Sequence, residues 1–157
     1  MDCELNGMKI KYESDKVWVW REMRGKQKLK NPDWREAKGG VKKGYRCVKI
    51  NKKDYKYHRV VYFIHNNGWK IHDSSTDNSI DHIDRDKLNN NIENLRVVTN
   101  QQNSWNADRK GYYLDKATGK YLARIGVDGK QKYLGMFVSE EDARDAYLIA
   151  KAEYHIF

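Results

Sequence analysis

Hydrophobic and polar positions along the chain follow several different periods. Residues 16–22 interleave valine with tryptophan, and this enrichment in β-branched and aromatic side chains predicts a strand. Residues 23–43 are basic and are interrupted by glycine and proline, so they predict a long loop. Residues 44–59 then predict a hairpin, and apolar side chains at helical spacing in residues 58–68 predict a short buried helix.

A strongly polar stretch, residues 79–103, occupies the centre of the chain and combines aspartate, histidine and asparagine. Residues 79–83 and 95–99 predict two short strands. The segment between them is too polar for a core element and predicts an ordered loop, and a helix is expected to open at Asn100. The predicted order is therefore strand, loop, strand and helix.

The pattern changes again after Arg109. Residues 111–115, 119–127 and 130–137 predict three strands, and Asp128-Gly129 is a strong two-residue hairpin signal between the last two. Residues 139–155 then predict an amphipathic helix, because Ser139 is a suitable N-cap and acidic residues fill the first turn. Three strands followed by one helix indicate a small α+β module.

The charge balance narrows the class of partner. Lys and Arg number 31 against 22 Asp and Glu, which gives a net charge of +9. This charge favours a nucleic-acid partner over the alternative of a basic protein that binds no polyanion. The two cysteines, Cys3 and Cys47, lack the spacing of a zinc site. No stretch approaches transmembrane length and the N-terminus lacks an apolar signal region, so we expect a cytoplasmic protein with no membrane partner.

Candidate chemistry gathers in the central stretch. Asp81 and Asn103 offer two oxygen ligands of the kind that Mg²⁺ accepts, and His82 offers an imidazole, the side chain commonly used as a general base. A base, a cation and a basic surface are the minimum equipment for phosphodiester hydrolysis. An Asp-His pair is also common at ordinary strand edges, and asparagine-rich loops commonly form turns, so the residues alone leave both interpretations open.

The segment Ile-Asp-His-Ile-Asp-Arg-Asp-Lys-Leu-Asn-Asn-Asn-Ile-Glu-Asn-Leu-Arg-Val-Val-Thr-Asn-Gln-Gln-Asn resembles the signature of the HNH endonucleases. It is most similar to the phage and intron-encoded homing enzymes, and the resemblance covers residues 44–106. It implies a ββα-metal fold in which His82 is the general base. Asp81 and Asn103 are implied ligands of one Mg²⁺ or Mn²⁺ ion, and Asn94 is implied to brace the loop and hold His82.

The C-terminal module is similar to AP2-type DNA-binding domains over residues 110–155. That resemblance implies a sheet lying in the DNA major groove, with a helix packed behind it. Alternation along the strands predicts that Ala123, Ile125 and Leu134 face the helix. The residues expected to contact DNA are Tyr113, Arg124, Gln131 and Tyr133 on the sheet, Lys116 and Lys120 near its first turn, and Arg59 and Arg96 in the central region. For the two central arginines, a solvated or salt-bridged role is an equal alternative.

Together these patterns and the two resemblances predict an α+β protein with three parts. Residues 1–43 form an N-terminal β and basic extension, residues 44–108 the HNH nuclease domain with its ββα-metal hairpin, and residues 109–157 the AP2-like module. The function that the HNH resemblance implies is that of a metal-dependent endonuclease that hydrolyses phosphodiester bonds in double-stranded DNA and leaves 5′-phosphate and 3′-hydroxyl ends. One chain carries one candidate site, so a monomer without an obligate protein partner is expected to nick one strand.

Two alternatives belong to other classes. The first is a sequence-specific DNA-binding regulator that has the hairpin but performs no chemistry. The second is a nuclease directed at RNA or at branched DNA. If the chain is phage-encoded, the expected compartment is the host cytoplasm.

Overall fold

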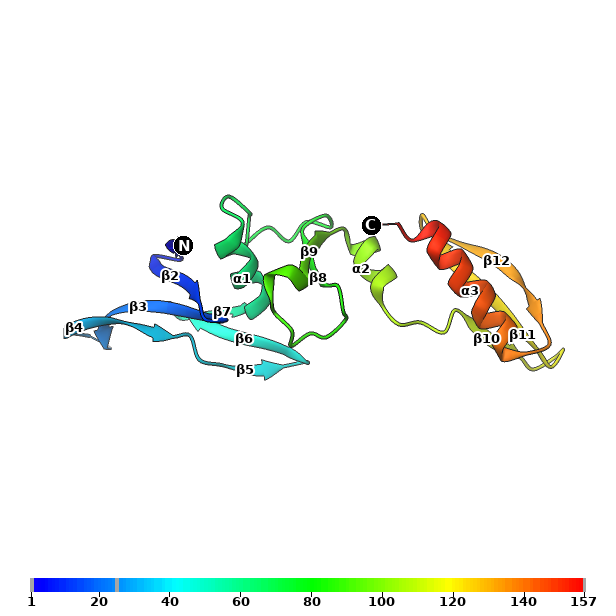
Figure 1. Ribbon diagram of the computed structural model, residues 1–157, viewed down its shortest axis with the longest axis horizontal. Helices are drawn as coiled ribbons and strands as arrows, with labels where there is room; N and C mark the ends of the chain where they lie inside the picture. Colours follow the sequence, from blue (N-terminus) through cyan, green and yellow to red (C-terminus); the bar gives the residue numbers. More distant parts are fainter. Residues whose placement is uncertain (1, 25, 157) are drawn as a thin grey trace. The chain divides into compact units, whose positions relative to one another are not determined.

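The computed structural model describes residues 2–24 and 26–156 (Figure 1). Over these residues it contains three α-helices, one 3-10 helix and four small antiparallel sheets, so the mixed fold class is confirmed. The chain divides into two compact units, residues 1–99 and residues 100–157. None of the described helices is long and apolar enough to cross a lipid bilayer.

The first unit begins with an antiparallel sheet of four strands in sequential order. Its strands are β1 (Asp2–Leu5), β2 (Met8–Glu13), β3 (Lys16–Arg24) and β4 (Gln27–Glu36). A second sheet follows with strands β5 (Gly39–Lys42), β6 (Tyr45–Ile50) and β7 (Lys53–Lys56). The strand expected at residues 16–22 and the hairpin expected at 44–59 are both present.

The prediction of a long loop over residues 23–43 is wrong, because β4 and β5 occupy most of it. The local sequence of β4 has low strand propensity, and its pairing with β3 stabilises the strand instead. Trp20 and Trp34 face each other across this ladder with ring centroids 5.5 Å apart. Pro32 is tolerated because β4 is an edge strand and its register against β3 is irregular at this point.

Helix α1 (Tyr57–His65) forms the centre of the first unit's core, as its apolar spacing predicts. It packs against β2, β6 and β7, and its buried side chains include Val60, Val61 and Ile64. The buried hydroxyl of Tyr57 accepts a hydrogen bond from the backbone N–H of Val17 at 2.9 Å. This bond ties the helix to β3, forty residues earlier in the chain.

The polar central stretch forms a short hairpin that completes the first unit. Strand β8 (Ser79–His82) pairs with strand β9 (Leu95–Val98), and the loop between them ends in the 3-10 helix η1 (Ile92–Asn94). The two predicted strands and the ordered loop are thus confirmed. The predicted helix is also present, as α2 (Asn100–Asn106), and it belongs to the second unit.

The second unit contains the predicted three strands and helix. They are β10 (Tyr112–Asp115), β11 (Lys120–Val127), β12 (Lys130–Phe137) and α3 (Glu140–Tyr154). Ser139 caps α3, since its hydroxyl accepts from the backbone N–H of Asp142 at 3.0 Å. Ile125 of the sheet packs on Tyr147 of the helix. Gly111 makes this packing possible, because a Cβ there would lie 2.0 Å from the ring of Tyr147.

The boundaries of the two units and the predicted domains do not coincide. Helix α2 groups with the C-terminal strands, so the division falls between Thr99 and Asn100. The expected division into residues 1–43, 44–108 and 109–157 stays a prediction.

Replacing Tyr57 by phenylalanine tests the tie between α1 and β3. Tyr57→Phe should lower the free energy of unfolding of the first unit by about 1–3 kcal/mol, because the buried N–H of Val17 loses its acceptor. Urea denaturation followed by tryptophan fluorescence measures this change. Tyr62→Phe removes the same atom from a half-buried ring on the same helix and should change the free energy by less than about 0.5 kcal/mol. Equal losses in the two variants would contradict the proposed tie.

Candidate active site

The β8–β9 hairpin places Asp81 and His82 side by side in one strand. Successive side chains of a strand point to opposite faces, so the two residues enter different surroundings. Asp81 pairs with Arg96 in the ladder, and His82 pairs with Leu95. Both side chains are nearly buried, with 5% of Asp81 and 5% of His82 exposed.

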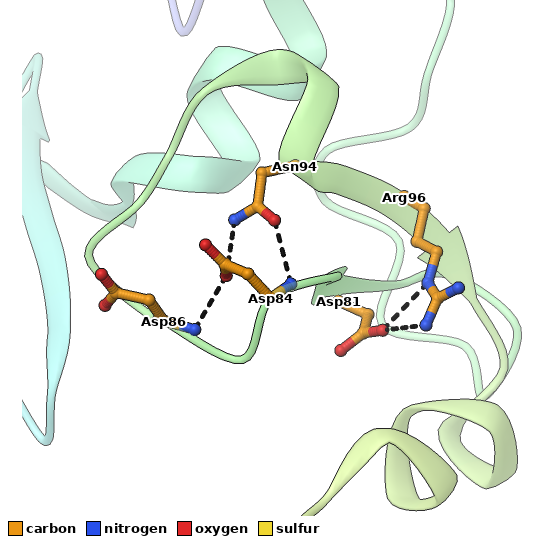
Figure 2. Close-up of polar contacts among 5 residues, drawn as sticks. All are labelled: Asp81, Asp84, Asp86, Asn94 and Arg96. Atoms are coloured by element: carbon orange, nitrogen blue, oxygen red, sulfur yellow. Dashed lines mark hydrogen bonds and ion pairs between the residues drawn. The ribbon is translucent and has the colours of Figure 1, made fainter.

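The carboxylate of Asp81 is held by the guanidinium opposite it. Arg96 donates to Oδ2 of Asp81 from Nε at 3.0 Å and from Nη2 at 2.8 Å (Figure 2). A carboxylate this poorly exposed requires a charged partner, and the cross-strand position supplies one. Of the alternatives for Arg96, the structure contains the salt-bridged arginine; whether Arg96 also contacts DNA stays a prediction.

The ring of His82 is oriented by Asn90, a residue to which sequence analysis gave no role. Nε2 of His82 lies 3.2 Å from Oδ1 of Asn90, and Nδ2 of Asn90 donates to the carbonyl of Leu88 at 2.8 Å. The second bond fixes the amide, so that its oxygen faces the histidine. An amide oxygen only accepts, and His82 therefore carries its proton on Nε2. In this tautomer Nδ1 is the basic nitrogen.

The chain offered one signal for this contact, the run of three asparagines at residues 89–91. An irregular loop lacks the regular side-chain alternation of a strand or helix, so the sequence does not predict which of the three asparagines is buried. The structure settles the choice, because Asn90 is buried and its two neighbours are exposed.

Two further rings enclose His82. His58 of α1 meets it edge to face at a centroid distance of 4.8 Å, and the ring of Tyr45 lies 6.2 Å away. Burial lowers the pKa of His58 to about 3, and the positive charges of His82, Lys56 and Arg59 contribute to the shift. His58 is thus a neutral, buried ring packed against the candidate base.

Asn94 braces the loop that follows β8. Its Nδ2 donates to Oδ1 of Asp84 at 2.9 Å and to the carbonyl of Asn89 at 2.8 Å, and its Oδ1 accepts from the N–H of Asp84 at 3.0 Å (Figure 2). Oδ1 of Asp84 also accepts from the N–H of Asp86 at 2.8 Å. Hydrogen bonds from Asn89 and Asn94 lower the pKa of Asp84. These two aspartates therefore shape the turn.

Arg59 is engaged within the first unit. Its guanidinium donates to the carbonyls of Asn78, Ile71 and Asp73 at 3.1, 2.7 and 3.0 Å. It also lies 4.6 Å from the ring centroid of Trp69. These contacts fix the segment that connects α1 to β8, and a contact between Arg59 and DNA stays a prediction.

The donor atoms present suit a cation that is only partly held by protein. The described residues contain no group of three or more His, Cys, Asp or Glu side chains arranged to hold a metal ion. Asp81 supplies one carboxylate, and Asn103, the second expected ligand, is an exposed residue of α2 in the other unit. Mg²⁺ is usually held by one or two carboxylates together with waters and substrate phosphates, so the carboxylate of Asp81 fits that chemistry. The role of Asn103 as a second ligand stays a prediction.

The C-terminal sheet separates its side chains as the alternation predicts. Ala123 and Ile125 are buried, and Leu134 packs at the edge of the same core. All six side chains expected to contact DNA are exposed: Tyr113, Lys116, Lys120, Arg124, Gln131 and Tyr133. The guanidinium of Arg124 lies 5.1 Å from the ring centroid of Tyr113. Their contact with DNA stays a prediction.

Comparison with known families identifies the central region. Residues 55–105 match the family model of the HNH endonucleases. No curated protein and no solved structure matches the chain. The matched segment contains Asp81, His82, Asn94 and Asn103, and it begins two residues before α1. This stretch of the chain is therefore similar to an HNH endonuclease domain, and the similarity points to a nuclease that acts on DNA.

The lowered pKa of His58 predicts a pH dependence of stability. The unfolded chain binds a proton at this ring below its ordinary pKa of 6.5, whereas the folded chain does so only near a pKa of about 3. Stability is therefore lost as the pH falls from 6.5 towards 3, by about 1.4 kcal/mol per pH unit. Urea denaturation at several pH values between about 4.5 and 6.5 measures this dependence where most carboxylates remain ionised, and comparison with a His58 variant separates the contribution of this ring from that of the other histidines.

His58→Phe should abolish this contribution to the slope. His72→Phe, at an exposed histidine, should retain it. An unchanged slope in His58→Phe would show that the buried ring does not resist protonation.

Proposed function

We propose that this chain is a metal-dependent endonuclease of the HNH homing type, which hydrolyses phosphodiester bonds in duplex DNA. The observation that carries the proposal is the orientation of His82 by Asn90, beside Asp81, in the hairpin of the family-matched segment. A fixed imidazole with a defined basic nitrogen is what general-base catalysis requires.

In the proposed mechanism, Nδ1 of His82 takes a proton from the attacking water. Asp81 and Asn103 would hold one Mg²⁺ or Mn²⁺ ion, which supplies charge stabilisation for the phosphate and its leaving 3′ oxygen when bound. Arg96 binds Oδ2 of Asp81 and thereby fixes the rotation of the carboxylate. Asn94 keeps the loop that carries Asn90 in shape. The products carry 5′-phosphate and 3′-hydroxyl ends.

The same proposal gives the second unit a DNA-reading role. The exposed sheet face with Tyr113, Arg124, Gln131 and Tyr133 would lie in the major groove, as in the AP2-type domains that it resembles, and Lys116 and Lys120 would contact phosphates. A chain with one such site would nick one strand as a monomer. We place this activity in the cytoplasm.

A second candidate function is a DNA-binding regulator without catalysis. Two observations favour it: the carboxylate of Asp81 is already paired with Arg96, and only 5% of His82 is exposed. A nuclease built on this hairpin must admit water to His82 and share Asp81 between a guanidinium and a cation. The cleavage experiment separates the two functions.

Cleavage of supercoiled plasmid tests the proposal. With Mg²⁺ the chain should convert supercoiled DNA to the nicked form, and EDTA should abolish the conversion because the cation is removed. His82→Ala should reduce the rate by about 10²- to 10⁴-fold, the usual contribution of a general base, and should leave DNA affinity nearly unchanged. His72→Ala, at a histidine outside the hairpin, serves as the matched control and should cleave normally.

A mobility shift without any nicked product would favour the regulator. Cleavage by His82→Ala at the normal rate would overturn the assignment of the base. Faster cleavage of RNA or branched DNA than of linear duplex would redirect the proposal to another substrate.

Substitution of Asn90 tests the orientation of the base. Asn90→Ala should lower kcat by about 10- to 100-fold with little change in KM, because the ring of His82 loses its fixed tautomer. Asn90→Asp restores an acceptor for Nε2–H, so it should recover much of the activity. Its added charge should move the acid limb of the pH–rate profile to higher pH. Asn91→Ala is the matched control, since Asn91 is exposed. Equal kcat in Asn90→Ala and Asn91→Ala would contradict the orienting role.

A further inference from the structure

Two lysines from different segments converge on the ring of Tyr45. Nζ of Lys56 lies 4.6 Å from the ring centroid, and Nζ of Lys87 lies 4.9 Å from it. Lys56 ends β7, Lys87 lies in the loop after β8, and Tyr45 begins β6. Three separate parts of the first unit therefore place two positive charges at one aromatic ring.

Neither ammonium forms an ion pair with a carboxylate among the residues that the structure describes. The nearest acidic residues along the loop of Lys87 are otherwise engaged. Asp84 accepts from Asn94 and Asn89, and Oδ1 of Asp86 accepts from the N–H of Leu88. The two like charges thus share one aromatic ring without a counter-charge among the described residues, an arrangement that a bound anion stabilises.

Both lysines are held on ordered parts of the chain. The loop of Lys87 is braced by Asn94, and a Cβ placed on Gly44 would lie 3.7 Å from Cδ of Lys87. The stem of this lysine therefore runs along the turn before Tyr45. A cation–π contact holds each ammonium near the ring without using its N–H donors. Those donors remain available to phosphate oxygens.

The ring of Tyr45 also contacts the candidate base. Its centroid lies 6.2 Å from that of His82 and 5.4 Å from that of His58. We propose that Tyr45, Lys56 and Lys87 form a binding site for a phosphate of the DNA strand next to the bond that is cut. A lysine ammonium that contacts a phosphate does not distinguish between bases, so this site would bind the DNA backbone independently of sequence. The inference deepens the proposed function and rests on it.

Salt-dependent DNA binding tests the site separately from catalysis. In the His82→Ala background, the affinity for a short duplex is measured by fluorescence anisotropy at several salt concentrations without metal. The variant Lys56→Gln/Lys87→Gln should lower the slope of log affinity against log salt by about 0.9, the value expected for one lost phosphate contact. Tyr45→Leu keeps both charges but removes the platform, so it should lower the slope partly.

Lys53→Gln is the matched control. Nζ of Lys53 lies 5.6 Å from the ring of Tyr55 on the neighbouring stretch of β7, so the residue makes the same kind of contact at a different ring. Lys53→Gln should leave the slope unchanged. In the cleaving protein, Lys56→Gln/Lys87→Gln should raise KM several-fold with kcat nearly constant, because the contact is made before and during the reaction.

Equal slopes for the double variant and for Lys53→Gln would overturn the phosphate site. Competition by inorganic phosphate as effective as that by duplex DNA, at equal phosphate concentration, would overturn the assignment to a DNA backbone. A lowered slope in a protein that never nicks DNA would support the site while refuting the nuclease. Normal nicking by the cleaving protein, together with an unchanged slope in Lys56→Gln/Lys87→Gln, would support the nuclease and refute the phosphate site.

Discussion

The register of β8 against β9 is the constraint on which the candidate site depends. It sets Asp81 across from Arg96 and sends His82 towards α1 and the asparagine-rich loop. A slip of one residue would exchange the two faces, and it would bury an unpaired carboxylate against His58. The loop opposes such a slip, because Asn94 bonds both the side chain and the backbone of Asp84. The positions of Asp81 and His82 are thus set by the main-chain pairing of β8 with β9 and by the side-chain amide of Asn94.

The surroundings of His82 combine three kinds of interaction that depend on one another. Asn90 selects the tautomer, His58 fills the space beneath the ring without adding charge, and Tyr45 links the ring to a positively charged surface. A charged His58 would repel the imidazolium that forms when His82 accepts a proton. Its burial therefore serves both the core and the candidate reaction.

Much of the fold could be predicted from the sequence, because most elements carry strong local signals. Helix α1 has apolar residues at helical spacing. Asp128-Gly129 is the typical two-residue turn of the hairpin formed by β11 and β12. Residues 27–36 could not be predicted as a strand, since their stability comes from pairing with β3 and from the Trp20–Trp34 contact rather than from local propensity. The residues of the site could be named from a family resemblance. The contacts of Asp81 with Arg96 and of His82 with Asn90 depend on strand register and on loop conformation. Neither of these can be predicted from the hydrophobic periodicity of a single sequence.

The contacts of Arg59 have a consequence for mutational tolerance. Its guanidinium donates to three main-chain oxygens, at residues 71, 73 and 78, and it also lies over the ring of Trp69. The three bonds from Arg59 reach main-chain oxygens and so do not depend on which side chains stand at these positions, whereas a change at residue 59 removes all three bonds at once. A single helical residue thus holds the segment between α1 and β8 at three points, and the side chain of Asn78 adds two bonds within the segment itself.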